Sequence, residues 1–320
     1  MFPSWFIKRA TKMYVLGIET SCDETSAAVV KDGREVLSNV VASSLAFHKK
    51  YGGVVPEIAF RKQLETIAQV ADTAVRDARI RLEDVGAVSV TDQPGLFGSL
   101  LVGIVFAKAV SASTGVPLLG VHHLYSHMYA SVLSAGGIRL PFVALIVSGG
   151  HTSLFYVEDF DRIKLLGATL DDACGEAFDK VAKILGLGYP GGPLIEQRAK
   201  KGDPAKIKFG CSVTKEPLDF SFSGIKTAVL YYVKKQPMGR ELVNDICASF
   251  QESVVKVLIH KTLLAVKAKK VKRIVVGGGV AANNYLRGRF SRAAEENGVS
   301  VYFPSKPLCM DNAAMVAGLG

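Results

Sequence analysis

The same local pattern occurs at two places in this chain, about 130 residues apart. At the first place the apolar run VLGI, which begins at Val15, leads into the polar turn ETSCDET and a second apolar run, SAAVV. At the second place VALIV, which begins at Val143, leads into SGGHT and SLFYV. Short β-branched runs on both sides of a polar turn predict a buried strand, a turn and another strand. The repeat therefore predicts two domains built on related α/β halves.

The remaining elements follow from apolar periodicity and from turn residues. Apolar residues recur at spacings of three and four over residues 58–80, which predicts an amphipathic helix. The segment SLLVGIVFAKAV at Ser99 is apolar nearly all round, so we expect a buried helix there. We also expect a hairpin turn at Asp32 and Gly33, strands at Ala87 and Arg273, helices over residues 171–185, 241–270 and from Asp311, and a loop over residues 186–193.

These elements suggest a division of the chain. We expect a first domain over residues 13–120, completed by the helix at residues 311–320, and a second domain over residues 121–310 with a helical insertion. Residues 1–12 form an N-terminal extension with Lys8, Arg9 and Lys12 and no acid, too short for the usual targeting peptide. Met13 is the expected functional start.

The composition indicates a globular protein with an anionic partner. Hydrophobic residues make up 49% and charged residues 21% of the 320 residues, which allows a sizeable core and excludes disorder. The longest apolar runs fall short of the roughly 18 residues that span a membrane, so we expect no membrane segment. Five scattered cysteines without a C-x-x-C pair favour a reducing, cytoplasmic location. The net charge of +10 favours a polyanion or an anionic small molecule as partner.

Two glycine-rich turns each follow a β-branched strand, VSGGH at Val147 and VGGGV at Val276. Consecutive glycines let backbone N–H groups converge on an anion, or let a flat ring lie against the main chain. Neither turn has the spacing of a P-loop or of a dinucleotide-binding G-x-G-x-x-G motif. This disfavours a P-loop NTPase and an ordinary Rossmann enzyme. The alternative is that these glycines only make tight turns.

A histidine cluster, VHHLYSH at Val121, suggests a metal site. In a helix, His123 and His127 lie one turn apart on one face and can share a metal ion, while His122 points elsewhere. The Glu of an H-E-x-x-H zinc protease is missing from its place, and Asp311 is a candidate third ligand. The alternatives are two buried histidines satisfied by hydrogen bonds, and an Asp311 that only caps the helix DNAAMVAG.

Two charged segments each have an ordinary and a functional interpretation. One broad polar face of a helix would hold Asp172, Glu176, Asp179 and Lys180. Such a face is either solvated or suited to bind a cation or hydroxyl groups. The basic run KAKKVKR over residues 267–273 is either a solvated helix end or a contact for a polyanion.

In their order along the chain these motifs resemble the TsaD family, the tRNA N6-adenosine threonylcarbamoyltransferases, in its bacterial branch. The resemblance covers residues 13–320 and rests on GIETSCDET at Gly17, GGVVPE at Gly52, PGLFGSLLVG at Pro94, HHLYSH at His122, VSGGHT at Val147, DDACGEAFDK at Asp171, YPGGP at Tyr189, FSFSGIKT at Phe220, GGGVAAN at Gly277 and DNAAM at Asp311.

The resemblance implies an actin-like, sugar-kinase and Hsp70-type (ASKHA) ATPase fold, with two related α/β domains and a nucleotide in the cleft between them. It implies an acyltransferase that moves the threonylcarbamoyl group from threonylcarbamoyl-adenylate to N6 of the adenosine just 3′ of the anticodon. The tRNAs concerned read codons that begin with A, and AMP is released. The adenylate-binding residues it implies are Ile146, Val147, Ser148, Gly149, Gly150, Asp179, Gly192, Glu196 and Asn283.

The same resemblance implies cofactors and partners. His123, His127 and Asp311 would hold one divalent metal ion, expected to be iron, with zinc or manganese as alternatives. An ATP- or AMP-type nucleotide or the adenylate would occupy the cleft. Besides tRNA, the expected partners are a TsaB-like paralogous subunit, a TsaE-like ATPase and a TsaC-type enzyme that supplies the adenylate. Asp23 or Glu24, in the first turn, is the candidate that assists proton removal from the attacking amine.

Three other functions compete with this interpretation. An actin-like small-molecule kinase or ATPase would use the same cleft but rarely needs a site of two His and one Asp. A metalloprotease would need a general base that the histidine motif does not place. A scaffold would bind nucleotide and tRNA while another subunit carried out the chemistry. Retention of metal and transfer to tRNA distinguish these alternatives.

Overall fold

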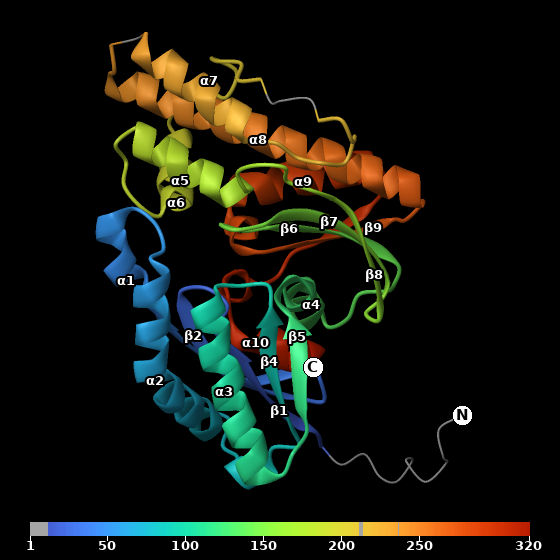
Figure 1. Ribbon diagram of the computed structural model, residues 1–320. Coiled ribbons are helices and arrows are strands. Elements are labelled where there is room, and N and C mark those ends of the chain that lie inside the picture. Colours follow the sequence, from blue (N-terminus) through green and yellow to red (C-terminus); the bar gives the residue numbers. More distant parts are fainter. Residues whose placement is uncertain (1–11, 211–213, 236) are drawn as a thin grey trace. The chain divides into compact units, whose positions relative to one another are not determined.

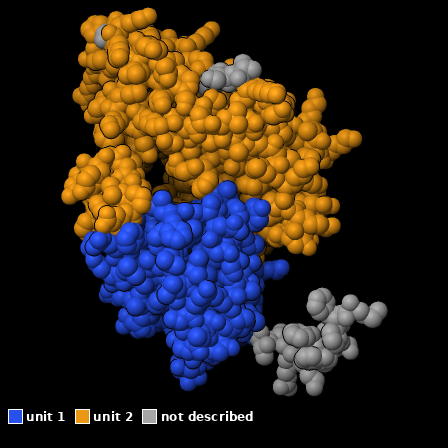
Figure 2. All heavy atoms as spheres, viewed as in Figure 1, with its two compact units in different colours: residues 1–43, 59–126, 312–320 blue, residues 44–58, 127–311 orange. Residues whose placement is uncertain are grey.

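The computed structural model describes residues 12–210, 214–235 and 237–320, so the expected extension over residues 1–12 lies outside the described residues except for Lys12. The chain divides into two compact units (Figure 2). Unit 1 comprises residues 1–43, 59–126 and 312–320, and unit 2 comprises residues 44–58 and 127–311. Compared with the expected division, residues 44–58 group with unit 2, and the boundary falls between Ser126 and His127.

The strands of unit 1 are β1 (Tyr14–Glu19), β2 (Glu24–Lys31), β3 (Glu35–Ser43), β4 (Ala87–Gln93) and β5 (Leu118–His122). They form one sheet in the order β3-β2-β1-β4-β5. β2 pairs antiparallel with β1 and β3, whereas β4 pairs parallel with β1 and β5. The expected hairpin turn between β2 and β3 is confirmed, since Asp32 and Gly33 both have positive φ.

The helices of unit 1 are α2 (Pro56–Asp77), from Ala59 onward, α3 (Phe97–Thr114) and α10 (Ala313–Leu319), with a 3-10 turn η3 (Leu82–Asp84). The end of the chain returns to this unit, because α10 packs on β1, β2 and β4 (Figure 1). Gly17 of β1 allows the close approach, since a Cβ there would lie 2.4 Å from the carbonyl oxygen of Ala313. The C-terminal helix therefore requires a glycine at this position of the sheet.

The strands of unit 2 are β6 (Phe142–Val147), β7 (Thr152–Asp159), β8 (Arg162–Ala168), β9 (Arg273–Gly277) and β10 (Ser300–Tyr302). They form a sheet in the order β8-β7-β6-β9-β10. β7 pairs antiparallel with β6 and β8, whereas β9 pairs parallel with β6 and β10. This is the connectivity of unit 1 repeated, so the duplication expected from the sequence is confirmed.

The helices and 3-10 turns of unit 2 are α1 (Leu45–His48), η2 (Lys49–Tyr51), α5 (Cys174–Ile184), α6 (Gly191–Ala199), α7 (Ser223–Lys234), α8 (Arg240–Lys269), η4 (Gly279–Ala282), α9 (Asn284–Glu296) and η5 (Lys306–Leu308), while α4 (His123–Ala135) crosses the boundary between the units. The long helix α8 packs on β6, β7 and β9 (Figure 1). Phe178 of α5 and Phe250 of α8 meet edge to face, with ring centroids 5.0 Å apart, in the core of this unit.

The expectation of a fully buried helix at Ser99 is wrong for α3. Its buried residues are Ser99, Val102, Gly103 and Ala107. On its other side Phe97, Leu101 and Val105 are 85%, 50% and 56% exposed. The reason is that α3 packs on one side only, against β4 and its neighbours. Within the described residues it is also the one helix whose length and mean hydropathy of 1.5 would suffice to cross a membrane.

Candidate active site

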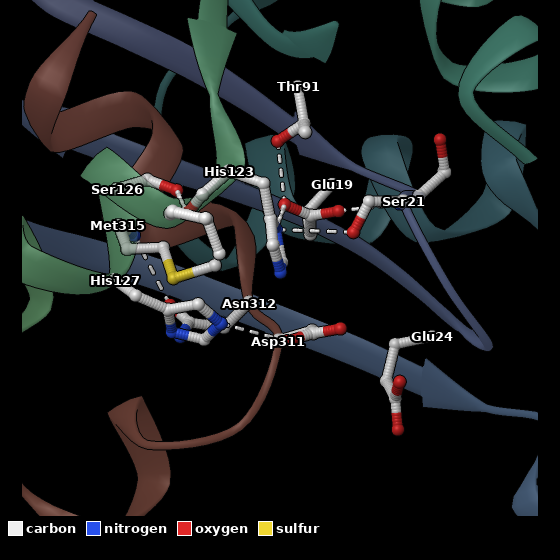
Figure 3. Close-up of polar contacts among 12 residues, drawn as sticks. Glu19, Ser21, Glu24, Thr91, His123, Ser126, His127, Asp311, Asn312 and Met315 are labelled. Carbon is white, nitrogen blue, oxygen red and sulfur yellow. Dashed lines mark hydrogen bonds and ion pairs between the residues drawn. The ribbon is translucent and has the colours of Figure 1, made fainter. Parts of the chain in front are cut away.

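His123, the first residue of α4, belongs to a hydrogen-bonded cluster at the end of β1 (Figure 3). Glu19 ends β1 and is fully buried. Its Oε1 accepts a hydrogen bond from the Ser21 N–H and its Oε2 accepts one from the Thr91 hydroxyl, both at 2.6 Å. The same Oε2 lies 3.0 Å from Nδ1 of His123. All four residues belong to unit 1.

This cluster determines which ring nitrogen of His123 carries the proton. A carboxylate offers only acceptors, so Nδ1 of His123 donates the hydrogen bond to Glu19. The Ser21 hydroxyl oxygen, 3.1 Å from the same nitrogen, is a second acceptor for that proton. In a neutral imidazole the lone pair then lies on Nε2. Nε2 is therefore the nitrogen of His123 whose lone pair is available to a metal ion.

His127 lies one turn further along α4 and is fully buried. Its Nε2 is 3.1 Å from Oδ1 of Asp311 within unit 2. His123, His127 and Asp311 each offer one ligand atom, and these atoms lie within 4.8 Å of one another. One continuous helix sets the spacing of the two histidines. Two imidazoles and one carboxylate at this spacing fit a divalent transition-metal ion.

Two neighbours of these ligands have other roles. Asn312, and not Asp311, caps α10, because its side chain accepts a hydrogen bond from a backbone N–H of that helix. His122 points elsewhere, as expected: its Nδ1 accepts a hydrogen bond from the Leu124 N–H at 3.2 Å, and its ring stacks on Tyr125. Burial lowers the pKa of His122, and the neighbouring histidine lowers it further. Because Asn312 caps α10, the alternative of Asp311 as the helix cap is wrong.

Asp23 and Glu24, the candidate bases, lie in the turn after β1 and at the start of β2. The Ser43 hydroxyl donates a hydrogen bond to Oε1 of Glu24 at 3.3 Å. In Figure 3 the Glu24 side chain points away from Glu19 and His123. The structure thus places Glu24 outside the Glu19 cluster, and the role of both acids rests on their position in the motif.

The residues expected to bind the adenylate all lie in unit 2. Ile146 and Val147 end β6, Ser148, Gly149 and Gly150 form the turn before β7, Asp179 lies in α5, Gly192 and Glu196 lie in α6, and Asn283 precedes α9. Three contacts connect these four segments, which are far apart in the sequence.

The first contact joins the glycine-rich turn to the start of α5. The Gly175 N–H donates to the Ser148 carbonyl oxygen at 3.0 Å, and a Cβ at Gly175 would lie 2.7 Å from that oxygen. Only glycine fits this approach. A Cβ added at Gly149 or Gly150, by contrast, would meet no described atom within 4 Å. The turn therefore has room for a ligand on that side.

The second contact joins α5 to α6. Oδ1 of Asp179 accepts a hydrogen bond from the N–H of Gly191, the first residue of α6, at 2.6 Å. Burial raises the pKa of Asp179, the Gly191 hydrogen bond opposes this rise, and the nearby Glu176 adds to it. A Cβ at Gly192 would also meet no described atom within 4 Å. Asp179 thus combines a fixed orientation with a carboxyl group that is reluctant to ionise.

The third contact joins α6 to α9. Oε1 of Glu196 accepts hydrogen bonds from the backbone and side-chain nitrogens of Asn284, at 3.0 and 2.8 Å. Asn283 caps α9, and its Nδ2 donates to Gln251 of α8 at 2.8 Å. The expected adenylate residues are therefore held in one connected set by the fold of unit 2.

The acidic face expected on α5 separates into two parts. Asp172 is ion-paired with Lys180 at 2.5 Å and with Lys226 at 3.0 Å, and Lys180 also pairs with Glu176 at 2.9 Å. Burial of Asp172 favours a higher pKa, but the two lysines outweigh it and the pKa is lowered. The two acids and the two lysines neutralise one another. Asp179, which forms none of these ion pairs, is the acid of this face that belongs to the adenylate set.

Glu19 is the residue of the cluster that the sequence interpretation missed. It lies inside the motif GIETSCDET, but the turn beyond it carries more obvious acids. The available signal was an acidic residue at the end of a strand whose other residues are apolar. A buried carboxylate needs several hydrogen-bond donors, and such a residue is therefore a candidate for a polar network.

Residues 35–318 match the model of the TsaD family, described as tRNA N6-adenosine threonylcarbamoyltransferase. The chain belongs to the TsaD family. A tRNA N6-adenosine threonylcarbamoyltransferase of Geotalea uraniireducens is 56% identical over 309 residues, which cover 95% of this chain and 90% of the relative. The protein of the same name from Syntrophotalea carbinolica is 51% identical over 311 residues, with 96% and 91% covered.

Solved structures confirm the expected ASKHA-type fold of this TsaD chain. Component A of the (R)-2-hydroxyglutaryl-CoA dehydratase of Acidaminococcus fermentans has a TM-score of 0.54 at 16% identity, over 96% of both chains. Full-length HypF has a TM-score of 0.63 at 16% identity, over 98% of this chain and 46% of HypF. At such low identity these likenesses concern the fold alone.

Proposed function

We propose that this chain transfers the threonylcarbamoyl group from threonylcarbamoyl-adenylate to N6 of the adenosine just 3′ of the anticodon, in tRNAs that read codons beginning with A. The observation that carries the proposal is the 56% identity to a tRNA N6-adenosine threonylcarbamoyltransferase over 95% of the chain. The chain is thus an acyltransferase of tRNA modification, and AMP is its second product.

The connected set in unit 2 suits an adenylate. Gly149 and Gly150 are exposed and a Cβ added at either would meet no described atom within 4 Å, so a ligand can approach their backbone N–H groups, which can donate to phosphate or carbonyl oxygens. Asp179 and Glu196 each use one carboxylate oxygen within the fold, and among the described residues no hydrogen bond engages the other. We assign these second oxygens to the hydroxyl groups of the substrate. Asn283 supports the set through its bond to Gln251.

We assign His123, His127 and Asp311 to one divalent metal ion, iron by the family resemblance, with zinc and manganese also compatible with this donor set. When bound, such an ion supplies positive charge that stabilises developing negative charge on substrate oxygens. Glu19 keeps the proton of His123 on Nδ1 and fixes the orientation of the ring. The protein's own contribution is therefore a preorganised pair of imidazoles on one helix face.

The proposed reaction is an acyl transfer from the adenylate to N6 of the adenosine. N6 forms a bond to the carbamoyl carbon, the bond from that carbon to the phosphate oxygen breaks, and AMP leaves with the electron pair. One proton leaves N6, and we propose Asp23 or Glu24 as its acceptor. Because AMP is a good leaving group, positioning and charge stabilisation are the main requirements of catalysis.

The exposed side of α3 suits a protein partner. Phe97, Leu101 and Val105 are spaced by four residues, so they form one apolar stripe along the helix. We propose that this stripe binds a TsaB-like paralogous subunit. The other proposed partners are a TsaE-like ATPase and a TsaC-type enzyme that supplies the adenylate. We propose that these proteins act on tRNA in the cytoplasm.

Transfer of radiolabelled threonylcarbamate to an unmodified tRNA transcript tests the proposal, with TsaB- and TsaE-type proteins and the adenylate supplied. We expect label on the tRNA with the wild-type chain and at least a hundredfold less with His123→Ala. His260→Ala is the matched control, because His260 is exposed on α8. Absence of label with the wild-type chain would contradict the transferase function. Equal label with wild type and His123→Ala would contradict the metal assignment.

A further inference from the structure

A cavity of about 310 Å³ lies in unit 2, on the side of α6 opposite to the adenylate residues. Its lining includes Leu187, Leu194, Gln197, Arg198, Lys201 and Arg240. An α-helix turns by about 100° per residue, so Leu194 and Arg198 are each rotated by about 200° from Gly192 and Glu196, which precede them by two positions. This cavity is therefore separate from the set assigned to the adenylate.

The charge of this cavity has one sign. Arg198, Lys201 and Arg240 contribute three positive charges, and no acid lines it. Among the described residues none of the three forms an ion pair with a carboxylate. Arg198 also lies near the thiol of Cys247, whose pKa burial raises to about 12, so this thiol is neutral at physiological pH.

The acids that lie near these cations in the sequence are mostly engaged elsewhere. Glu196 accepts two hydrogen bonds from Asn284. Asp203 accepts a bond from the Ala205 N–H, and Asp245 accepts one from the Asp203 N–H. Glu241 is exposed next to Arg240 and does not line the cavity. The positive charge around the cavity is therefore only partly compensated by the protein.

Two further features favour a phosphate group as the occupant. Arg240 opens the long helix α8, whose N-terminus adds a positive partial charge to that of the side chains. Leu187 and Leu194 give the cavity an apolar wall, against which a sugar can lie. Arginine binds phosphate oxygens with two parallel hydrogen bonds, and lysine binds them as a point charge.

We propose that this cavity binds a phosphate of the tRNA backbone while the anticodon region is modified. The proposal rests on the proposed function, because it takes tRNA as the substrate. Lys201 and Arg240 are exposed, so they can reach a phosphate that approaches from solution as part of a large molecule. A contact of this kind adds affinity without reading the base sequence.

Fluorescence anisotropy with an unmodified tRNA transcript tests the proposal, with full-length protein at salt concentrations from about 50 to about 200 mM. The test variant is Lys201→Ala with Arg240→Ala. The matched control is Lys164→Ala with Arg292→Ala, which removes the same charges from exposed positions of unit 2 outside the cavity. Thermal melting of each variant shows that the fold is kept.

We expect the slope of log affinity against log salt to become less steep by about 1 to 2 for the test variant, and to change much less for the control. Equal slopes for test variant and control would overturn the proposal. So would a test variant that loses binding of AMP or inorganic phosphate while its tRNA slope stays that of wild type, because the cavity would then serve a free anion.

The transfer assay with the wild-type chain separates this proposal from the proposed function. Label transferred by wild type, together with equal slopes, would overturn the phosphate site and leave the transferase function standing. Binding of tRNA without transfer would contradict the function, and the slopes would still decide the phosphate site. If the wild-type chain does not bind tRNA at all, both proposals are wrong.

Discussion

Oε2 of Glu19 lies 3.0 Å from Nδ1 of His123, and both side chains are shielded from solvent. The two residues come from the end of β1 and the start of α4, about 100 positions apart in the sequence. Such a carboxylate–imidazole pair raises the basicity of the other ring nitrogen and holds the ring in one orientation. Glu19 thus links the first sequence motif of the chain to the proposed metal site.

We predict that Glu19→Gln lowers the affinity for the divalent metal by about 10- to 100-fold, because the amide cannot accept all the hydrogen bonds that the carboxylate accepts. Calorimetric titration of the metal-free protein with Fe²⁺ or Zn²⁺ measures this affinity. Glu65→Gln, at an exposed position of α2, is the control. An unchanged metal affinity in a folded Glu19→Gln protein would show that Glu19 does not position His123.

Asp179→Asn is expected to stabilise the protein at neutral pH. The pKa of Asp179 in the native state is raised above its ordinary value of 3.8. At pH values between 3.8 and this raised pKa, the native state therefore binds more protons than the unfolded state. The free energy of unfolding therefore falls as the pH rises through this window, and asparagine removes that dependence. Asparagine can still accept the Gly191 hydrogen bond.

Urea denaturation from about pH 4 to about pH 8 measures this effect, and the two proteins should differ most at the upper end. The KM for the adenylate should rise in the same variant if Asp179 holds the substrate. An Asp179→Asn protein that is less stable than wild type at neutral pH would contradict the assignment of a raised pKa.

The close packing of α10 on β1 predicts a stability difference between two glycines. Gly17→Ala should cost about 1–3 kcal/mol of unfolding free energy, because the new Cβ overlaps the backbone of Ala313. Gly53→Ala should change it by less than about 0.5 kcal/mol, since a Cβ there would meet no described atom within 4 Å. Chemical denaturation of the two variants checks this, and similar losses in both would refute the packing argument.

The apolar stripe on α3 predicts a partner-binding variant with a normal fold. Leu101→Glu with Val105→Glu should weaken binding of a TsaB-like subunit by at least about tenfold, as charges replace the exposed apolar contacts. Leu165→Glu is the control, because Leu165 is also exposed but lies on β8 of unit 2. Calorimetry with the purified subunit measures the affinity, and an equal effect of the control would remove the support for this surface.

The repeated hairpins could be predicted from the sequence because their signal is local. Strand residues, turn residues and the second strand follow one another at Val15 and again at Val143, and pairing between neighbours then needs no long-range information. The order of the outer strands was not predicted. This order depends on where β5 and β10 join the sheets. Because β10 has only three residues, it is too short for its apolar pattern to identify a strand.

Two errors have a common physical cause, since composition does not show which neighbours a segment meets. The loop expected over residues 186–193 contains the start of α6, because the N–H of Gly191 bonds to Asp179 and the helix begins there despite its glycines and prolines. The apolar sequence of α3 predicted burial on all sides, but the chain covers one side only. The role of Glu19 likewise depends on a partner far away in the sequence.

The duplicated sheet places two chemically opposite turns at equivalent positions. The turn after β1 begins at a buried carboxylate that gathers hydrogen-bond donors, including an imidazole. The corresponding turn after β6 contains Gly149 and Gly150, which are exposed, and its Ser148 carbonyl oxygen accepts a hydrogen bond from Gly175 in the first turn of α5. The same hairpin architecture thus carries a hydrogen-bond-accepting carboxylate in one unit and an open pair of glycines in the other, so duplication of the backbone left each copy free to acquire its own chemistry.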